Sequence, residues 1–198
     1  VDVIHEEAEE DIMRLAGVGE SDIFWTVSET TKRRFLWLLV NLGTAVLASI
    51  VISWFGATIE QIVALAILMP IVASMGGNAG TQTMTVTVRA LATRDLTATN
   101  AFRVVSKELI VGFINGVLFA ALVAVIAGIW FGGVALGGVI AAAMVINMIV
   151  AALAGILIPL GFSRFGTDPA VAATVLVTTV TDVVGFFAFL GLGAWLLL

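Results

Sequence analysis

The chain has 198 residues, of which 61% are hydrophobic and 12% are charged, and its mean hydropathy is +1.15. A soluble domain is usually about 45–50% apolar and about a quarter charged, so this composition excludes an ordinary water-soluble globular protein. The chain contains no cysteine, no tyrosine and a single histidine. These counts exclude a thiolate metal cluster, a thiol nucleophile and a metal site built from several histidines of one chain.

The first 31 residues form an acidic, amphipathic arm. They hold nine acidic residues and one basic residue, Arg14, so the arm carries −8 while residues 32–198 sum to +3 and the whole chain to −5. The arm begins with acidic residues and lacks an apolar segment of its own, which is unlike a signal peptide. We therefore predict an acidic arm over residues 1–31, followed by a mildly basic membrane domain over residues 32–198.

Five apolar blocks follow the arm, and one membrane span needs roughly 20 apolar residues. They predict an all-α, polytopic membrane protein with helices over residues 35–55, 62–91, 109–130, 134–160 and 171–198. The second block is the least regular, because Pro70 is followed by the segment Gly76-Gly77-Asn78-Ala79-Gly80-Thr81-Gln82-Thr83. We expect this sequence to break or loosen the second span and to let another helix approach closely.

Basic residues collect on the cytoplasmic side of short loops, which predicts the orientation of the spans. All nine can be placed on one side: Arg14, Lys32, Arg33, Arg34, Arg89, Arg94, Arg103, Lys107 and Arg164. Trp54, Trp130 and Trp195 then lie at the outer ends of spans, as expected of interfacial anchors. We predict a multi-pass protein of the cell (inner) membrane, with a cytoplasmic N-terminus and an outside C-terminus.

Asp182 is the one acidic residue inside an apolar block, about twelve residues from either end of the fifth span and so near the membrane midplane. A charge at that depth costs on the order of 3 kcal/mol or more, which makes Asp182 a functional candidate. The structural alternative is a protonated aspartate hydrogen-bonded between helices. One face of the same predicted helix carries Val171, Thr174, Thr178, Asp182 and Gly185.

This face suits water or a hydrated ion better than lipid, although its threonines could instead bond back to carbonyls one turn earlier. We expect Asn78, in the irregular second span, to lie at the depth of Asp182 and to add an amide oxygen. Carboxylate, amide, hydroxyl and carbonyl oxygens suit hard cations, which favours magnesium or calcium over zinc or copper. A twofold axis beside the fifth span would bring two Asp182 carboxylates together.

The motifs resemble those of a known family. Residues 70–82, residues 87–92, Asp168-Pro169-Ala170 and Thr178-Thr179-Val180-Thr181-Asp182 closely resemble the transmembrane domain of MgtE magnesium channels. The resemblance implies a homodimer with five helices per protomer and an ion pore on the twofold axis, lined by the second and fifth helices. It also implies that Asp182 holds a largely hydrated Mg²⁺, assisted by Asn78 and the backbone near Thr178.

Family members usually carry cytoplasmic N-terminal and CBS domains that sense magnesium and close the pore. The resemblance implies that those domains are missing here, that Val1 to about Gly17 is the end of a CBS domain, and that the segment to Thr31 is a connecting helix. The expected partners are therefore a second copy of the chain, the lipid bilayer and the missing domains, with no nucleic acid among them.

We expect a passive, magnesium-selective channel, with Mn²⁺ or Ca²⁺ as alternative cargo. The first alternative is a proton-coupled secondary transporter of divalent cations, in which Asp182 would cycle its protonation and the broken span would alternate access. The second is a membrane enzyme, which is disfavoured because no His, Cys or Tyr reaches the apolar region to act with Asp182.

Overall fold

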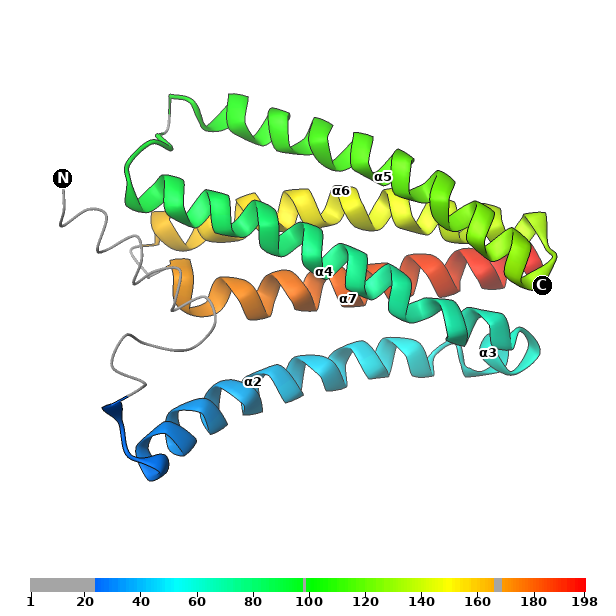
Figure 1. The fold of residues 1–198 in the computed structure, drawn as a ribbon, viewed down its shortest axis with the longest axis horizontal. Coiled ribbons are helices and arrows are strands. Elements are labelled where there is room, and N and C mark those ends of the chain that lie inside the picture. Colours follow the sequence, from blue (N-terminus) through cyan, green and yellow to red (C-terminus); the bar gives the residue numbers. More distant parts are fainter. Residues whose placement is uncertain (1–23, 98, 166–168) are drawn as a thin grey trace.

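The structure is a computed structural model that describes residues 24–97, 99–165 and 169–198. Its helices, in chain order, are α2 (Val27–Ser53), α3 (Gly56–Gln61), α4 (Val63–Ala92), α5 (Ala101–Phe131), α6 (Val134–Arg164) and α7 (Pro169–Leu197) (Figure 1). Five of these are long and apolar enough to cross a membrane, namely all except α3. The all-α fold and the predicted number of spans are confirmed. Most of the acidic arm, and Asp168, lie outside the described residues.

The helix α2 begins eight residues before the predicted start of the first span. Thr26 and Glu29 form a capping box, in which the backbone N–H of Glu29 donates to the Thr26 hydroxyl at 3.4 Å and the backbone N–H of Thr26 donates to the Glu29 carboxylate at 3.2 Å. These bonds satisfy donors that the first turn of a helix leaves open. The helix therefore starts in polar sequence and runs without a break across the boundary predicted between residues 31 and 32.

The predicted break in the second span is wrong, because α4 is one continuous helix from Val63 to Ala92. Pro70 lies inside it, on an exposed side, and the glycine-rich segment 76–83 is helical throughout. A proline removes one backbone donor, but in apolar surroundings every other backbone group gains by staying bonded within the helix. The second expectation for this segment, close approach of another helix, is confirmed below.

The third span also begins earlier than predicted, since α5 starts at Ala101 rather than near residue 109. Before it, the Asn100 side chain closes the loop, because its Oδ1 accepts from the Thr97 backbone N–H at 2.8 Å and its Nδ2 donates to the Asp95 carbonyl at 2.7 Å. The helix ends at Gly132, whose φ of 68° gives the left-handed cap that glycine adopts without a steric penalty. Hydrophobicity predicted only the apolar part of α5, which begins in polar sequence.

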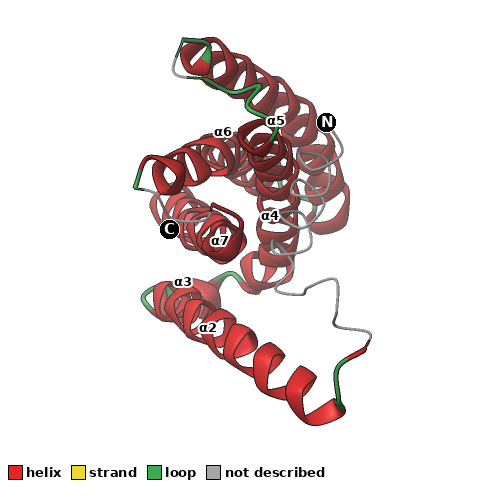
Figure 2. Cartoon of the chain, turned by 90° about the vertical axis from the view of Figure 1, so that its left-hand side faces the viewer, coloured by secondary structure: helices red, strands yellow, loops and turns green. Residues whose placement is uncertain are grey.

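The central element of the bundle is α6, which packs against α5, α7 and α4 (Figure 2). The largest fully buried side chains come from α4, α6 and α7 and include Leu65, Leu68, Met84, Ile140, Met144, Ile156, Phe189 and Leu190. By contrast, α2 touches chiefly α7 and leaves most of its large apolar side chains exposed. Such a face suits lipid or a second polypeptide chain rather than water.

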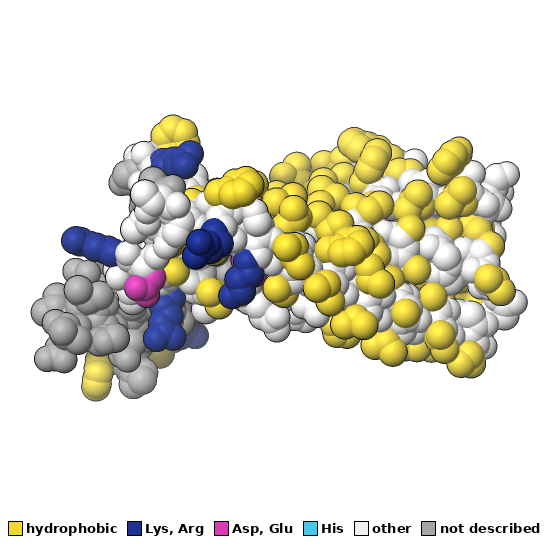
Figure 3. All heavy atoms as spheres, turned by 90° about the horizontal axis from the view of Figure 1, so that it is seen from above, with side chains coloured by type: hydrophobic (Ala, Val, Ile, Leu, Met, Phe, Trp, Pro, Cys, Tyr) yellow, Lys and Arg dark blue, Asp and Glu magenta, His cyan; other side chains and the backbone are white. Residues whose placement is uncertain are grey.

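Charge and aromatic residues separate along the bundle. The described basic side chains gather at one end, where α2 and α5 begin and α4 and α6 end, while apolar side chains cover much of the remaining surface seen in Figure 3. Trp54, Trp130 and Trp195 are exposed near the opposite ends of α2, α5 and α7. This arrangement matches the pattern expected of a membrane bundle with one basic side, and which side faces the cytoplasm stays a prediction.

Candidate functional site

Asp182 lies at the middle of α7 and is half-buried. Among the residues that the structure describes, none forms an ion pair or a hydrogen bond with its carboxylate. The structural alternative required hydrogen bonds from a neighbouring helix to a protonated Asp182, and no such bond is found in the described part of the chain. An acid at mid-span without a protein partner is a candidate for contact with water or a cation.

Three threonines of α7, namely Thr178, Thr179 and Thr181, donate their hydroxyl hydrogens to carbonyls of the same helix. The Thr178 hydroxyl donates to the carbonyls of Thr174 and Val175 at 3.0 and 3.1 Å, and the Thr181 hydroxyl donates to the Thr178 carbonyl at 3.0 Å. The alternative that the Thr178 hydroxyl bonds back to a carbonyl one turn earlier is therefore confirmed. Its oxygen still has lone-pair capacity, so a part-buried Thr178 hydroxyl could accept from an ion's water while it donates to the backbone.

The other predicted site residues fall in different surroundings. Thr174 is half-buried one turn from Thr178, and Gly185 is buried against α6. Val171 lies in α7, but its side chain is outside the described part of the structure. Asn78 is exposed on α4, where its Nδ2 donates to the Ser74 hydroxyl at 3.4 Å. Its part in an ion site with Asp182 stays a prediction.

Glycines on α4 determine how closely the helices approach. A Cβ on Gly80 would lie 2.6 Å from the Val177 side chain of α7, and a Cβ on Gly76 would lie 2.2 Å from Asn147 of α6. The same Asn147 would meet a Cβ on Gly185 at 2.7 Å. These contacts set residues 76–80 of α4 beside residues 177–185 of α7, so Asn78 and Asp182 occupy the same level of the bundle.

Asn147 is the residue of this region that the sequence reasoning missed. It is fully buried, and its Nδ2 donates to the Val72 carbonyl at 2.9 Å, which joins α6 to α4. Its Oδ1 is buried and has no hydrogen-bond partner among the described residues. The signal was present in the sequence, because Asn147 is the one amide side chain in the apolar block 134–160 and polar groups at that depth are rare.

The described residues include no group of three His, Cys, Asp or Glu side chains that could hold a metal ion. Asp182 is the one acidic residue of α7, so this helix offers a divalent ion a single carboxylate with hydroxyl and carbonyl oxygens nearby. Mg²⁺ dehydrates reluctantly and is commonly held by one or two carboxylates while it keeps several waters. The geometry suits a loosely held, hydrated ion rather than a structural metal.

A family model described as a divalent cation transporter, MgtE, matches residues 69–192. The chain belongs to the MgtE family. The match covers most of α4 and α7 and all of α5 and α6, so it includes Asn78, Glu108, Asn147 and Asp182. The membership that the sequence motifs predicted is confirmed, and a membrane protein with several spans is what both the family and the apolar helices support.

Curated relatives named magnesium transporter MgtE align with nearly the whole chain. The protein of Thermus thermophilus is 34% identical over 200 residues, which are 100% of this chain and 44% of the relative. That of Bacillus subtilis is 31% identical over 193 residues, or 97% of this chain and 43% of the relative. The chain thus spans less than half the length of these MgtE relatives.

Proposed function

We propose that this chain forms the membrane pore of a magnesium channel, in which hydrated Mg²⁺ passes along a face made by α4 and α7. The observation that carries the proposal is Asp182, a half-buried carboxylate at the middle of a membrane-length helix without a hydrogen-bond or ion-pair partner among the described residues. Membership of a divalent cation transporter family, and relatives named magnesium transporter, support Mg²⁺ as the cargo. Mn²⁺ or Ca²⁺ could take its place at the same oxygens.

We further propose that two copies assemble around a twofold axis beside α7. One carboxylate gives a weak divalent site, and a second copy would supply another at the same depth. The assembly would place two Asp182 side chains across a wet path, with Asn78, Thr178 and backbone carbonyls as further oxygens. A hydrated ion would pause there and then move on, because weak binding through retained waters permits release.

The direction of transport would follow the membrane potential. With the basic end of the bundle in the cytoplasm, an inside-negative potential favours inward movement by about 2.3 kcal/mol per charge per 100 mV. A proton-coupled transporter remains the second candidate, because Asp182 could carry a proton in place of an ion. The continuous α4 removes the broken span on which that alternative partly relied.

The experiment compares Mg²⁺ uptake into liposomes that contain either the unchanged protein or the Asp182→Asn variant. Uptake is followed with ²⁵Mg²⁺ or with a Mg²⁺-sensitive dye. We expect uptake to fall at least about tenfold, because a contact to a charged group is worth about 1.5–3 kcal/mol. The matched control is Asp95→Asn, a change of the same kind in an exposed loop, where the Thr93 hydroxyl that donates to Asp95 at 2.7 Å can donate to the new amide oxygen. Unchanged uptake in Asp182→Asn would contradict the proposal.

A second measurement separates the channel from the carrier. In a planar bilayer with a fixed pH gradient, a channel gives currents that reverse at the Mg²⁺ equilibrium potential, and we expect this result. A reversal potential that moves with the pH gradient at constant Mg²⁺ would favour the proton-coupled transporter instead.

A further inference from the structure

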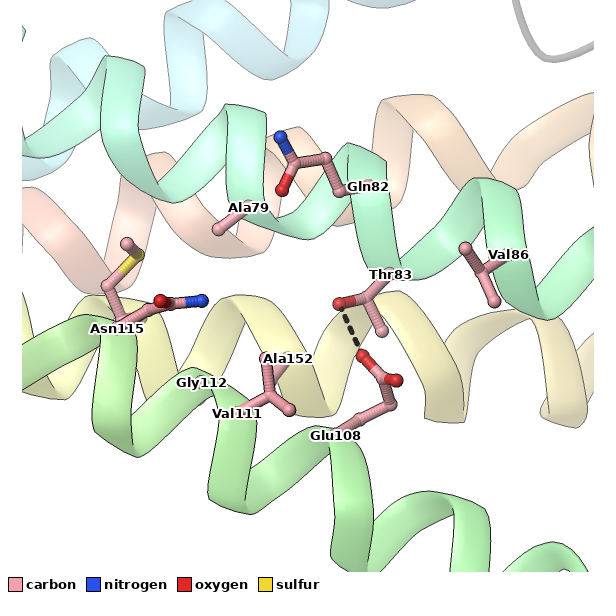
Figure 4. A pocket seen from close by; sticks show the side chains of 10 residues that line it. Ala79, Gln82, Thr83, Val86, Glu108, Val111, Gly112, Asn115 and Ala152 are labelled. Atoms are coloured by element: carbon pink, nitrogen blue, oxygen red, sulfur yellow. Dashed lines mark hydrogen bonds between the residues drawn. The ribbon is translucent and has the colours of Figure 1, made fainter.

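A pocket lined by four polar and several apolar residues lies in the bundle, on the side of α6 away from α7. It has a volume of about 130 Å³, is partly open, and is lined by α4, α5 and α6 (Figure 4). Its polar lining is Gln82 and Thr83 from α4 and Glu108 and Asn115 from α5, and Met148 and Ala152 of α6 form part of its apolar wall. None of these residues lies on α7, and Gln82 follows Asn78 by one helical turn on α4.

Glu108 is the charged group of this pocket. Its carboxylate accepts a hydrogen bond of 3.1 Å from the Thr83 hydroxyl, and the dashed line in Figure 4 marks this contact across the space between the helices. Glu108 is half-buried, and no ion pair with any described residue neutralises it. The carboxylate has further lone pairs that one hydroxyl cannot satisfy.

The pocket extends to membrane depth. Glu108 is seven residues into α5, and Asn115 lies seven residues further, at the midpoint of the helix and about 10 Å deeper at the ordinary helical rise. Gln82 and Asn115 are exposed within a single chain. A carboxylate and two amides facing hydrocarbon would be costly, which favours water or a polar ligand in this pocket.

The oxygen donors in the pocket favour a hard cation. One carboxylate, one hydroxyl and two amide groups are the ligand types that Mg²⁺ and similar ions prefer over nitrogen or sulfur. A water occupies about 30 Å³ in the liquid, so the pocket has room for an ion with a few of its waters. The nearby Arg103 and Lys107 line a different hollow on the surface of α5, together with Phe102 and Ile110.

We propose that the pocket between α4, α5 and α6 is a second cation site, which binds a divalent cation with part of its hydration shell through Glu108. Asp182 belongs to α7 and Glu108 to α5, and α5 packs against α6 rather than against α7 (Figure 2). Binding at Glu108 does not depend on Asp182, and either site could exist without the other.

The test uses Mn²⁺ as the probe, because its anomalous scattering locates it in crystals. In crystals of the protein soaked with Mn²⁺, we expect an anomalous peak in the pocket, within reach of the Glu108 carboxylate. The peak should be lost in Glu108→Gln and kept in Asp182→Asn. Glu60→Gln is the matched control, because Glu60 is exposed on α3, remote from this pocket in sequence and structure, and this variant should keep the peak.

Glu108→Gln removes the charge but keeps an oxygen that can accept from Thr83, so the link between α4 and α5 is preserved. In solution, Mn²⁺ affinity for this site should fall at least about tenfold, the scale of losses seen when a metal ligand loses its support. Water alone beside Glu108 in the wild-type map, or the same pocket peak in Glu108→Gln, would overturn the proposal. If that variant fails to fold, the wild-type map alone decides.

Discussion

At the scale of single residues, Asn147 joins the three helices that surround the Asp182 level. Its amide donates to the Val72 carbonyl of α4 and lies between Gly76 of α4 and Gly185 of α7. Neither glycine position has room for a Cβ while the amide is present. Because Gly185 follows Asp182 by about one helical turn, the amide determines how the Asp182 segment of α7 sits against its neighbours.

This packing predicts a suppressor pair. Gly185→Ala should lower protein stability by about 1–3 kcal/mol, because the new methyl group would meet the Asn147 amide at 2.7 Å and overpack the junction. Gly185→Ala should also lower Mg²⁺ uptake. Adding Asn147→Ala should restore part of the stability and part of the uptake that Gly185→Ala loses, since the smaller side chain leaves room for the methyl group. We would measure thermal unfolding in detergent and Mg²⁺ uptake into liposomes for both single variants and the double variant. The comparison gives the interaction between positions 147 and 185. Additive losses would show that the two residues do not share a contact.

At the scale of elements, α4 packs on α6 through large buried side chains and, around Gly80 and Gly155, through closely approaching backbones. A Cβ on Gly155 of α6 would lie 2.7 Å from the Gly80 carbonyl oxygen and 2.8 Å from the Thr83 Cβ. Small residues let membrane helices approach this closely, and close approach gains van der Waals contact where hydrophobic burial offers little. The continuous α4 can therefore contact α6 and α7 without the break that the sequence suggested.

The prediction at this scale compares two glycines of α6. Gly155→Ala should destabilise the bundle by about 1–3 kcal/mol, because the facing carbonyl belongs to backbone and cannot turn aside. Gly138→Ala should leave stability unchanged or raise it by about 0.5–1 kcal/mol, because nothing lies within 4 Å of its Cβ position and alanine favours a helix. Thermal unfolding midpoints compare the two. Equal midpoints would contradict the packing described for α4 and α6.

At the scale of the whole molecule, two features of the single chain suggest that a second copy completes it. The helix α2 exposes large apolar side chains along much of its length, and α4, α6 and α7 contain no acidic residue besides Asp182. Lipid alone could cover α2, but lipid cannot supply another acid to a divalent site. The proposed twofold assembly accounts for both features.

Cross-linking tests this assembly, because the chain has no cysteine of its own. Thr178→Cys places one thiol on the Asp182 face of α7, and a short bifunctional maleimide should join two chains in membranes if these faces meet across an axis. Ile129→Cys is the control, since it is exposed near the end of α5 and should give far less dimer. Similar yields of dimer from both variants would argue against an axis beside α7.

The sequence alone was sufficient for the properties that depend on position along the chain. Hydrophobic length predicted five spans, the basic residues predicted one charged end, and the helical rise placed Asp182 at mid-span. The motifs around Asn78 and Asp182 also identified the MgtE family, as the match over residues 69–192 confirms. Residues 1–23 of the acidic arm and the Val171 side chain lie outside what the structure describes, so the predictions made for them stand as predictions.

Only the tertiary structure decided which faces of the helices meet. Periodicity cannot say that Asn147 lies between Gly76 and Gly185, or that Glu108 reaches Thr83 across a pocket, because those partners are far apart in sequence. The prediction of a break at Pro70 was also wrong, because the cost of one lost hydrogen bond is small beside the cost of unwinding a helix in an apolar medium. Hydrophobicity is a property of each segment, whereas rotation and contact depend on the packing of all the segments together.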